Sequence, residues 1–479
     1  MGSGMTRRSL LALVGMGAVG AAALAACGAT PTPQVVEKVV TQEVEKEVTK
    51  IVAGTPEVVK ETAVVKEPVV VEQTAPPVTS GPPVTISVHF ENDPNQTAVQ
   101  QEWTAKFEEA NPNIHAELVF EPWSEWQVKQ LTLAAAGQTP DIMSVHIMRA
   151  QILSEMGALL PVDDWVAADA SFDTKDYYPP SLVMFTWKDK LYGFPWDWGS
   201  ACLAYNKNMF DAASEAYPNE DWTFDDMLSV ATRLTKEGNF GFDELPSGDI
   251  SCGPLYLGPW GGAFVNDEET KCLVDTAESK TALQWWADLR LKHKVVPTPA
   301  DYQALQALGA TPFLSGKVGM CPLYPWSVLT TSQFANFGWD VAPWPKGPVT
   351  RISGAVGSGY GIGKDSQHPQ EAWLFLRWFA SKEGHAFLWG SKGASLPARR
   401  SAQDAFLKAP GQAAHAKYWV DALDQYAVMG RPISSPAYEF TTIVGREFEL
   451  IFLGEKSVEE GAAAACADAQ KLLDESQSA

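Results

Sequence analysis

Two tryptophans flank a carboxylate in the triplet Trp196-Asp197-Trp198, which directly follows Pro195. A sugar ring presents an apolar C–H face that packs on an aromatic ring, and an edge of hydroxyls that bonds to short polar side chains. These residue types, interleaved on a loop, therefore predict carbohydrate binding. The same pattern also fits alternate indoles packed into the core, with Asp197 capping a turn, so the triplet supports two interpretations.

A second candidate pairs an aromatic side chain with glycines, at Trp260-Gly261-Gly262. Glycine has no Cβ and lets the backbone approach a ligand closely. The chain carries 18 tryptophans, more than core packing alone leads us to expect, and this supply favours a protein that uses aromatic contacts for binding. Core packing is the alternative for Trp260.

Motifs for covalent or metal-dependent catalysis are missing from the sequence. It contains no G-x-S-x-G, H-E-x-x-H or G-x-x-x-x-G-K-S/T pattern, and the glycine cluster within 354–363 does not fit G-x-G-x-x-G. The seven histidines are scattered without metal-ligand spacing. We therefore expect no cofactor, no metal and no enzymatic activity. A carbohydrate-active hydrolase stays open as an alternative, because it needs only two carboxylates across a cleft.

The net charge is strongly acidic, since 36 Lys and Arg stand against 58 Asp and Glu for a formal balance of −22. Nucleic-acid binding requires clustered positive side chains that neutralise phosphates, and adsorption to anionic lipid has the same requirement. The balance therefore argues against both partners. At about 100–200 residues per domain, the 479 residues of the chain predict two or three folding units.

The first 26 residues have the composition of an export signal. Arg7 and Arg8 precede a Gly/Ala-rich apolar run over 10–26, which ends in Leu24-Ala25-Ala26-Cys27. Small residues before a cleavage point are what a signal peptidase requires, and this ending resembles a bacterial lipobox. The resemblance implies that 1–26 is a lipoprotein signal peptide and that a lipid on Cys27 anchors the protein to the outer face of the cell membrane. An ordinary signal peptide is the alternative.

Residues 27–83 are predicted to form a disordered tether. Val, Glu, Lys, Thr and Pro dominate this segment, which has no aromatic residue and therefore little apolar surface to offset the entropy of ordering. The alternation of valine with charged residues also fits a strand or a coiled coil, but prolines interrupt it repeatedly.

Five cysteines follow Cys27, an odd number without a C-x-x-C spacing, so a zinc or redox motif is not supported. Outside the cell one pair such as Cys252–Cys272 can form, and buried free thiols are the alternative.

Downstream of Val84 the hydrophobic periodicity predicts an α/β fold. Apolar residues alternate over 84–90 and over 114–120, and a helix with apolar residues at every fourth position lies between these strands. This β-α-β order predicts a parallel strand pair with a right-handed crossover. Further helices are predicted over 125–136, from the N-cap Thr223 to 235, and over 279–293, 369–380 and 458–473.

Short motifs recur along the same part of the chain. The first are the strand and helix over 84–110, Gly137-Gln138-Thr139-Pro140-Asp141-Ile142, and Leu191-Tyr192-Gly193-Phe194-Pro195 followed by Tyr205-Asn206-Lys207-Asn208-Met209-Phe210. The later ones occupy 313–320 with Pro325-Trp326, 339–345, 353–362 and 452–460. In this order they resemble the family 1 extracellular solute-binding proteins of ABC importers, the group that includes maltose-binding protein.

The resemblance implies a two-lobe, periplasmic-binding-protein-like (type II) α/β fold with the ligand in a cleft between the lobes. Three crossings of the chain are expected near 200–205, 339–342 and 356–362. Lobe one would comprise 84–200 plus 343–356, and lobe two 205–338 plus 362–479. The implied function is extracytoplasmic binding of a di- or oligosaccharide by a monomer that closes on its ligand and delivers it to the membrane subunits of an ABC permease. A non-sugar solute bound by the same fold is the alternative.

The resemblance also adds candidate ligand-binding residues to the triplet and to Trp260 and Gly261. They share a position beside a crossing or in a loop that faces the cleft in this family, and they are Trp326, Trp344, Tyr438, His146 and Ser144. Core packing is the alternative for Trp326, and hinge packing is the alternative for Trp344.

Overall fold

The computed structural model describes residues 36–52, 55–71, 82–91, 94–236, 238–243, 249–309, 311–434 and 436–478. The chain divides into two compact units, Met1–Pro77 and Val78–Ala479. The predicted signal peptide and the lipidation residue Cys27 lie outside the described residues, so both stay predictions.

The first unit contains a β-hairpin where we predicted a disordered tether. β1 (Val36–Val52) pairs antiparallel with β2 (Thr55–Val71) along their whole length. The prediction of disorder is therefore wrong for these two segments, because the alternation of valine with charged residues has the period of a strand. Pro68 lies opposite Val39 in this ribbon. Both strands are edge strands, where proline is tolerated because its missing N–H can face away from the partner.

A five-stranded sheet forms the centre of the first lobe of the second unit, in the order β4-β3-β5-β15-β8. Its strands are β3 (Val84–Glu91), β4 (Ile114–Glu121), β5 (Ile142–His146), β8 (Gly193–Pro195) and β15 (Ser358–Ile362). β3 runs parallel to β4 and β5, which confirms the predicted parallel pair, whereas β15 is antiparallel to β5 and β8.

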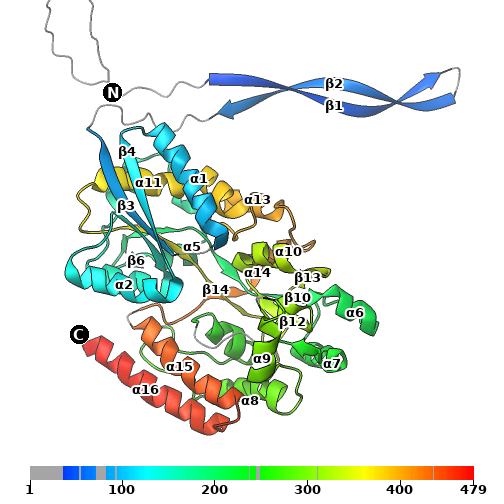
Figure 1. Cartoon of the computed structure of the whole chain (residues 1–479), viewed down its shortest axis with the longest axis vertical. Coiled ribbons are helices and arrows are strands. Elements are labelled where there is room, and N and C mark those ends of the chain that lie inside the picture. Colours follow the sequence, from blue (N-terminus) through cyan, green and yellow to red (C-terminus); the bar gives the residue numbers. More distant parts are fainter. Residues whose placement is uncertain are drawn as a thin grey trace, which may run out of the picture. The chain divides into compact units, whose positions relative to one another are not determined.

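Helices cover both faces of this sheet (Figure 1). Phe90 of β3 stacks on Phe379 of α11 on one face, and His89 contacts Trp126 of α2 on the other, because successive strand residues point to opposite sides. The helices of this lobe include α1 (Pro94–Ala110), α2 (Trp123–Ala136), α3 (Ile147–Glu155), α4 (Asp163–Ala168), α5 (Pro179–Val183), α11 (Pro369–Phe379), α12 (Lys382–His385) and α13 (Gln403–Leu407). A small hairpin of β6 (Thr186–Trp187) and β7 (Lys190–Leu191) accompanies them.

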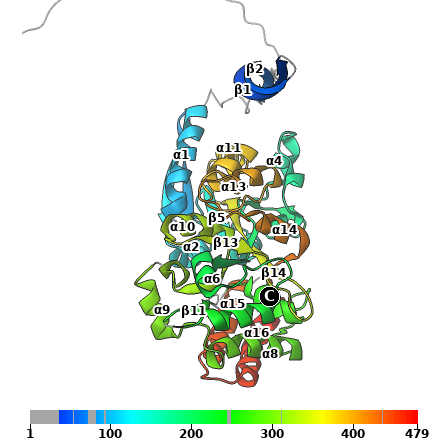
Figure 2. The ribbon, with the colours of Figure 1, turned by 90° about the vertical axis from the view of Figure 1, so that its right-hand side faces the viewer.

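The second lobe is built on a four-stranded sheet with the order β11-β12-β10-β13. Its strands are β10 (Cys202–Asn206), β11 (Phe240–Phe242), β12 (Val318–Leu323) and β13 (Trp339–Ala342). Its helices include α6 (Lys207–Ala213), α7 (Phe224–Leu234), α8 (Ala277–Leu291), α9 (Pro299–Gln306), α10 (Val328–Phe334), α15 (Ala437–Phe452) and α16 (Val458–Ser478). In both views α8 and α16 lie at the end of the unit opposite to α1 and α11 (Figure 2).

The helices predicted from the sequence are confirmed with small shifts of their ends. Thr223 caps α7 through a capping box, in which its hydroxyl accepts from the N–H of Asp226 and the Asp226 carboxylate accepts from the N–H of Thr223. Gly137 ends α2 in the left-handed conformation, which glycine adopts without a steric cost.

A three-stranded sheet, β16-β14-β9, marks the connection between the lobes. It is formed by β9 (Gly199–Ser200), β14 (Ser353–Val356) and β16 (Ala427–Met429), with α14 (Lys417–Gln425) packed against it. β9 lies between β8 of the first lobe and β10 of the second, and β14 leads from the second lobe into β15 of the first. The chain therefore crosses at both of these points, and β16 precedes the return to α15.

Two segments belong to the opposite lobe from the one we predicted. Residues 343–356 were expected in lobe one, but Trp344 packs on Phe224 and Trp286 of the second lobe. The start of 362–479 was expected in lobe two, but α11 packs on α1, where Trp378 stacks on Trp103. The predicted crossing at 339–342 is likewise wrong, because β13 pairs with β10 inside the second-lobe sheet.

A disulfide joins Cys272 to Cys466 of α16, with 5.5 Å between their Cα atoms. The suggested pair Cys252–Cys272 is therefore wrong, and Cys252, like Cys202 and Cys321, is a buried cysteine that forms no disulfide with the described residues. Among the described residues, no helix combines the length and the apolar character needed to cross a bilayer.

Candidate functional site

The triplet Trp196-Asp197-Trp198 lies in an extended segment that runs beside 396–398. The N–H of Trp198 donates to the carbonyl of Leu396, and the N–H of Ala398 donates to the carbonyl of Trp196. The indole of Trp196 is 2% exposed and stacks on Trp389, with 5.2 Å between ring centroids. The packing alternative therefore describes Trp196 in this structure.

Asp197 is buried and joins three separate stretches of chain. Its carboxylate accepts a hydrogen bond from the N–H of Ser358 at 2.9 Å and another from the Ser395 hydroxyl at 2.8 Å. Burial raises the pKa of Asp197 to about 6, although both hydrogen bonds favour the charged form and oppose this shift. The carboxylate has a structural role at the crossing rather than the turn-capping role of the alternative.

Three further predicted indoles, Trp198, Trp260 and Trp344, are also enclosed. Trp198 is 2% exposed and Trp344 is fully buried, and Trp260 packs between Phe224 and Trp285 in the second lobe. Gly261 has a φ of 85°, which explains the glycine by backbone conformation. A Cβ on Gly261 would meet no atom closer than 3.8 Å, so the close approach that we predicted is not what requires glycine here.

One group of side chains joins the two lobes, and we name Trp123, His146, Arg149, Tyr438 and Glu439 the interlobe cluster. Arg149 of α3 donates from Nη1 to Oε1 of Glu439 in α15 at 3.1 Å. The guanidinium also lies over the Tyr438 ring, 4.2 Å from its centroid. The sequence predicted His146 and Tyr438, and the structure brings both into this cluster.

His146 ends β5 and caps α3, so its ring is fixed by the strand-to-helix turn. Its Nδ1 accepts from the N–H of Met148, and its ring packs at right angles to that of Trp123, with centroids 4.9 Å apart. The pKa of His146 is lowered to about 4, chiefly by burial and also by the nearby Arg149, while Asp249 opposes the shift. The imidazole is therefore uncharged at neutral pH and can form a hydrogen bond with an uncharged partner.

Two polar atoms of the interlobe cluster have no partner. Nε of Arg149 and Oε2 of Glu439 are both buried, and neither makes a hydrogen bond with any part of the chain that the structure describes. Arg149 is 2% exposed. A buried polar group without a partner costs free energy, so these two atoms form a donor and an acceptor that a bound molecule can satisfy.

Ser144 and Trp326 lie outside the interlobe cluster. Ser144 is buried beneath α2, where its hydroxyl accepts from the N–H of Glu91 and its carbonyl accepts from Nε1 of Trp126. Trp326 is half-buried and stacks on Tyr324 at 4.3 Å, and the Tyr324 hydroxyl donates to Ser251. Trp326 thus keeps an exposed portion that a ligand can contact.

The sequence did not single out Arg149 or Glu439. Arg149 stands one helical turn after His146, and this i, i+3 spacing was the available signal. Glu439 adjoins the predicted Tyr438, but a lone acid in the first turn of a helix is ordinarily explained by the helix dipole.

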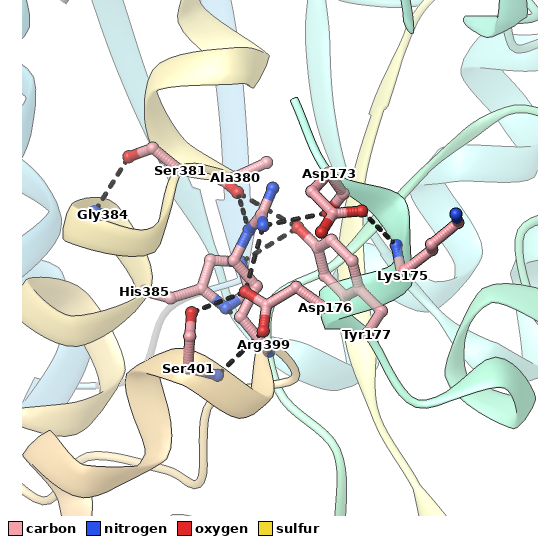
Figure 3. Close-up of polar contacts among 10 residues, drawn as sticks. All are labelled: Asp173, Lys175, Asp176, Tyr177, Ala380, Ser381, Gly384, His385, Arg399 and Ser401. Atoms are coloured by element: carbon pink, nitrogen blue, oxygen red, sulfur yellow. Dashed lines mark hydrogen bonds and ion pairs between the residues drawn. The ribbon is translucent and has the colours of Figure 1, made fainter. Parts of the chain in front are cut away.

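A second buried polar network, around Arg399, has its groups occupied by protein partners (Figure 3). Arg399 donates from Nε to the carbonyl of Ala380 and from Nη1 to Asp176, whose carboxylate also accepts from Ser401. Burial raises the pKa of Tyr177 to about 12 and, together with Arg399, holds the pKa of His385 well below its usual value. The network fixes three distant segments of the first lobe to one another.

Comparison with known proteins agrees with this architecture. The family model for bacterial extracellular solute-binding proteins matches residues 92–386. A binding protein of Brucella abortus (strain 2308) and one of Brucella suis biovar 1 are 23% identical over 389 residues, which covers 77% of this chain and 88% of each relative.

The chain aligns with solved structures of the same two-lobe fold over nearly the whole length of each of them. The ABC substrate-binding protein Lmo0181 of Listeria monocytogenes, solved with cycloalternan, has a TM-score of 0.72 at 22% identity over 82% of this chain and 99% of its own. The GacH receptor of Streptomyces glaucescens has a TM-score of 0.71 at 22% identity, over 81% and 98%. The maltodextrin-binding domain MalE of Bdellovibrio bacteriovorus, bound to maltotriose, has a TM-score of 0.68 at 18% identity, over 81% and 99%. The chain therefore belongs to the bacterial extracellular solute-binding proteins and has their two-lobe type II fold.

Proposed function

We propose that the protein binds a di- or oligosaccharide outside the cytoplasm and delivers it to an ABC permease by closure of its two lobes. The observation that carries the proposal is the pair of unpartnered atoms, Nε of Arg149 and Oε2 of Glu439, where the lobes meet. A sugar hydroxyl both accepts and donates hydrogen bonds, so sugar hydroxyls can accept from Nε of Arg149 and donate to Oε2 of Glu439.

Aromatic side chains around these atoms suit the apolar face of the same ligand. Tyr438 contacts Arg149, and Trp123 is 39% exposed beside His146. We propose that Trp123, Tyr438 and the exposed part of Trp326 contact C–H faces, while Arg149, Glu439 and the neutral His146 bind hydroxyls. Relatives of this fold in complex with cycloalternan and with maltotriose support the ligand class.

Closure follows from where these groups lie. Arg149 and Glu439 come from different lobes, so a ligand that bonds to both is held fully only when the lobes are together. A ligand shifts an open–closed equilibrium by its difference in affinity for the two states. We further propose that the closed form is the one that a permease recognises, and that the protein acts as a monomer held to the outer face of the membrane by a lipid on Cys27.

Native mass spectrometry with a carbohydrate panel tests this function. The full chain is incubated with maltotriose, mannotriose, cycloalternan and acarbose, and the products are analysed in parallel. We expect one retained ligand per protein, unchanged sugar, and a smaller radius of gyration in solution scattering. Cleaved sugar would support the alternative of a hydrolase. Retention of a non-sugar solute from the expression host would support the other alternative.

A further inference from the structure

A tight hairpin over 264–273 lies on the second lobe, far along the chain from the interlobe cluster. Phe264 and Leu273 pair at its base, and Val265 bridges to Cys272. Glu269 at its tip adopts a φ of 54°, in the left-handed region that is sterically unfavourable for a residue with a side chain. The hairpin therefore holds this residue in a conformation that its own preferences disfavour.

The Glu269 carboxylate binds the segment that leads into α15. It is 8% exposed and accepts hydrogen bonds from the N–H groups of Ile433 and Ser434 at 3.1 and 2.9 Å. Nη1 of Arg431 donates to it at 2.6 Å. Bonds to a buried carboxylate are stronger than those between neutral groups, so Glu269 fixes the course of 431–434.

This segment sets the start of α15. The N–H of Ala437 donates to the carbonyl of Ser434 at 2.8 Å, and the next two residues are Tyr438 and Glu439, which meet Arg149. Phe264 at the base of the hairpin also contacts Phe440. A shift of 431–434 would therefore move the second-lobe half of the interlobe cluster.

The disulfide braces the hairpin that carries Glu269. Cys272 is bonded to Cys466 of α16, and Gln470, one turn further along α16, accepts from the N–H of Cys272 and donates to the carbonyl of Thr270. One covalent bond and two hydrogen bonds thus tie the hairpin to the C-terminal helix.

We propose that Glu269 is a positioning residue for ligand binding, which sets Tyr438 and Glu439 opposite Arg149 from a hairpin braced by the Cys272–Cys466 disulfide. The inference rests on the proposed function, because it assigns a role toward the site where the sugar would bind. Glu269 itself does not contact the interlobe cluster.

Hydrogen–deuterium exchange on the full chain tests the positioning without any ligand. We compare Glu269→Ala and the milder Glu269→Gln with Glu268→Gln, a matched control on the exposed neighbour in the same hairpin. Loss of the buried carboxylate should speed exchange of the amides over 433–440 by about tenfold or more, while the rest of α15 and α16 keep wild-type rates. Glu269→Gln should show an intermediate effect because it retains one carbonyl acceptor, and Cys272→Ser/Cys466→Ser should loosen the same amides.

Maltotriose, mannotriose, cycloalternan and acarbose then serve as probes of affinity. We expect Glu269→Ala to weaken the binding of whichever sugar the wild type retains by about tenfold. Glu269→Gln should weaken it less, and Glu268→Gln should bind this sugar with wild-type affinity. Wild-type exchange over 433–440, faster exchange spread evenly over the second lobe, or local loosening with unchanged affinity would each overturn the proposal. If the wild type binds none of the four sugars, the proposed function fails, and the exchange result alone decides whether Glu269 fixes the start of α15.

Discussion

The carboxylate of Asp197 accepts a hydrogen bond from the N–H of Ser358, 2.9 Å away, and so joins two crossings of the chain. Asp197 stands between β8 and β9, and Ser358 is the first residue of β15. At the same place a Cβ on Gly357 would lie 2.3 Å from the carbonyl oxygen of Asp197. Glycine is therefore required there for the two crossings to approach each other.

Asp197 should make stability fall as pH rises through the weakly acidic range. Burial raises the pKa of Asp197 in the folded protein to about 6, above the value of an unfolded Asp. Its contribution to the free energy of unfolding is therefore complete below pH 4 and is lost as pH rises through 6. Relative to Asp197→Asn, the wild type should lose roughly 3 kcal/mol of unfolding free energy between pH 4 and pH 7. Urea unfolding across this range measures the difference, and a difference that does not vary with pH would contradict the assignment.

His385 should produce the opposite dependence. Burial and the adjacent Arg399 lower its pKa well below that of an unfolded histidine, so the unfolded chain takes up a proton that the folded chain refuses. The stability of the wild type should therefore fall, relative to His385→Gln, by up to about 1.4 kcal/mol for each pH unit below 6.5. Thermal unfolding from pH 7.5 to pH 5 tests this, and parallel curves for the two proteins would refute it.

Trp196 and Trp326 should separate stability from binding. Trp196 is enclosed against Trp389 and Tyr360, so Trp196→Ala should lower the unfolding free energy by about 3–5 kcal/mol. Trp326 is half-buried and stacks mainly on Tyr324, so Trp326→Ala should cost only about 1 kcal/mol of stability and weaken sugar binding instead. Calorimetric titration and urea unfolding of both variants decide the matter. A stable Trp196→Ala, or a Trp326→Ala with wild-type affinity, would be inconsistent with these roles.

Much of the fold could be predicted because its signals are local. The alternation over β3, the capping residue Thr223 of α7 and the terminal glycine of α2 each act within a few residues. The lobe to which each segment after β13 belongs could not be predicted in this way. It depends on whether β15 pairs with β5, and that pairing joins Tyr360 to Ser144 across more than 200 positions. The disulfide partner of Cys272 could not be predicted for the same reason, because Cys466 lies 194 positions away in the sequence.

The site was predicted less well because tryptophan serves cores and ligands equally. An indole has the same type and sequence neighbours whether it packs on Trp389, as Trp196 does, or faces a sugar. Arg149 was missed for a related reason, since a single basic residue on a short helix usually faces solvent. Only the approach of α15 shows that Arg149 is enclosed by the other lobe.

Calorimetric titration of the wild type and Arg149→Met with the sugar retained in native mass spectrometry tests the central claim most directly. The control is Arg233→Met on α7, which removes an exposed arginine that pairs with Glu215. We predict wild-type binding with a Kd of about 1 μM or tighter, a loss of about a hundredfold in Arg149→Met and no change in Arg233→Met. Equal affinity of wild type and Arg149→Met, in proteins with the same circular dichroism, would contradict the claim that a sugar binds between Arg149 and Glu439.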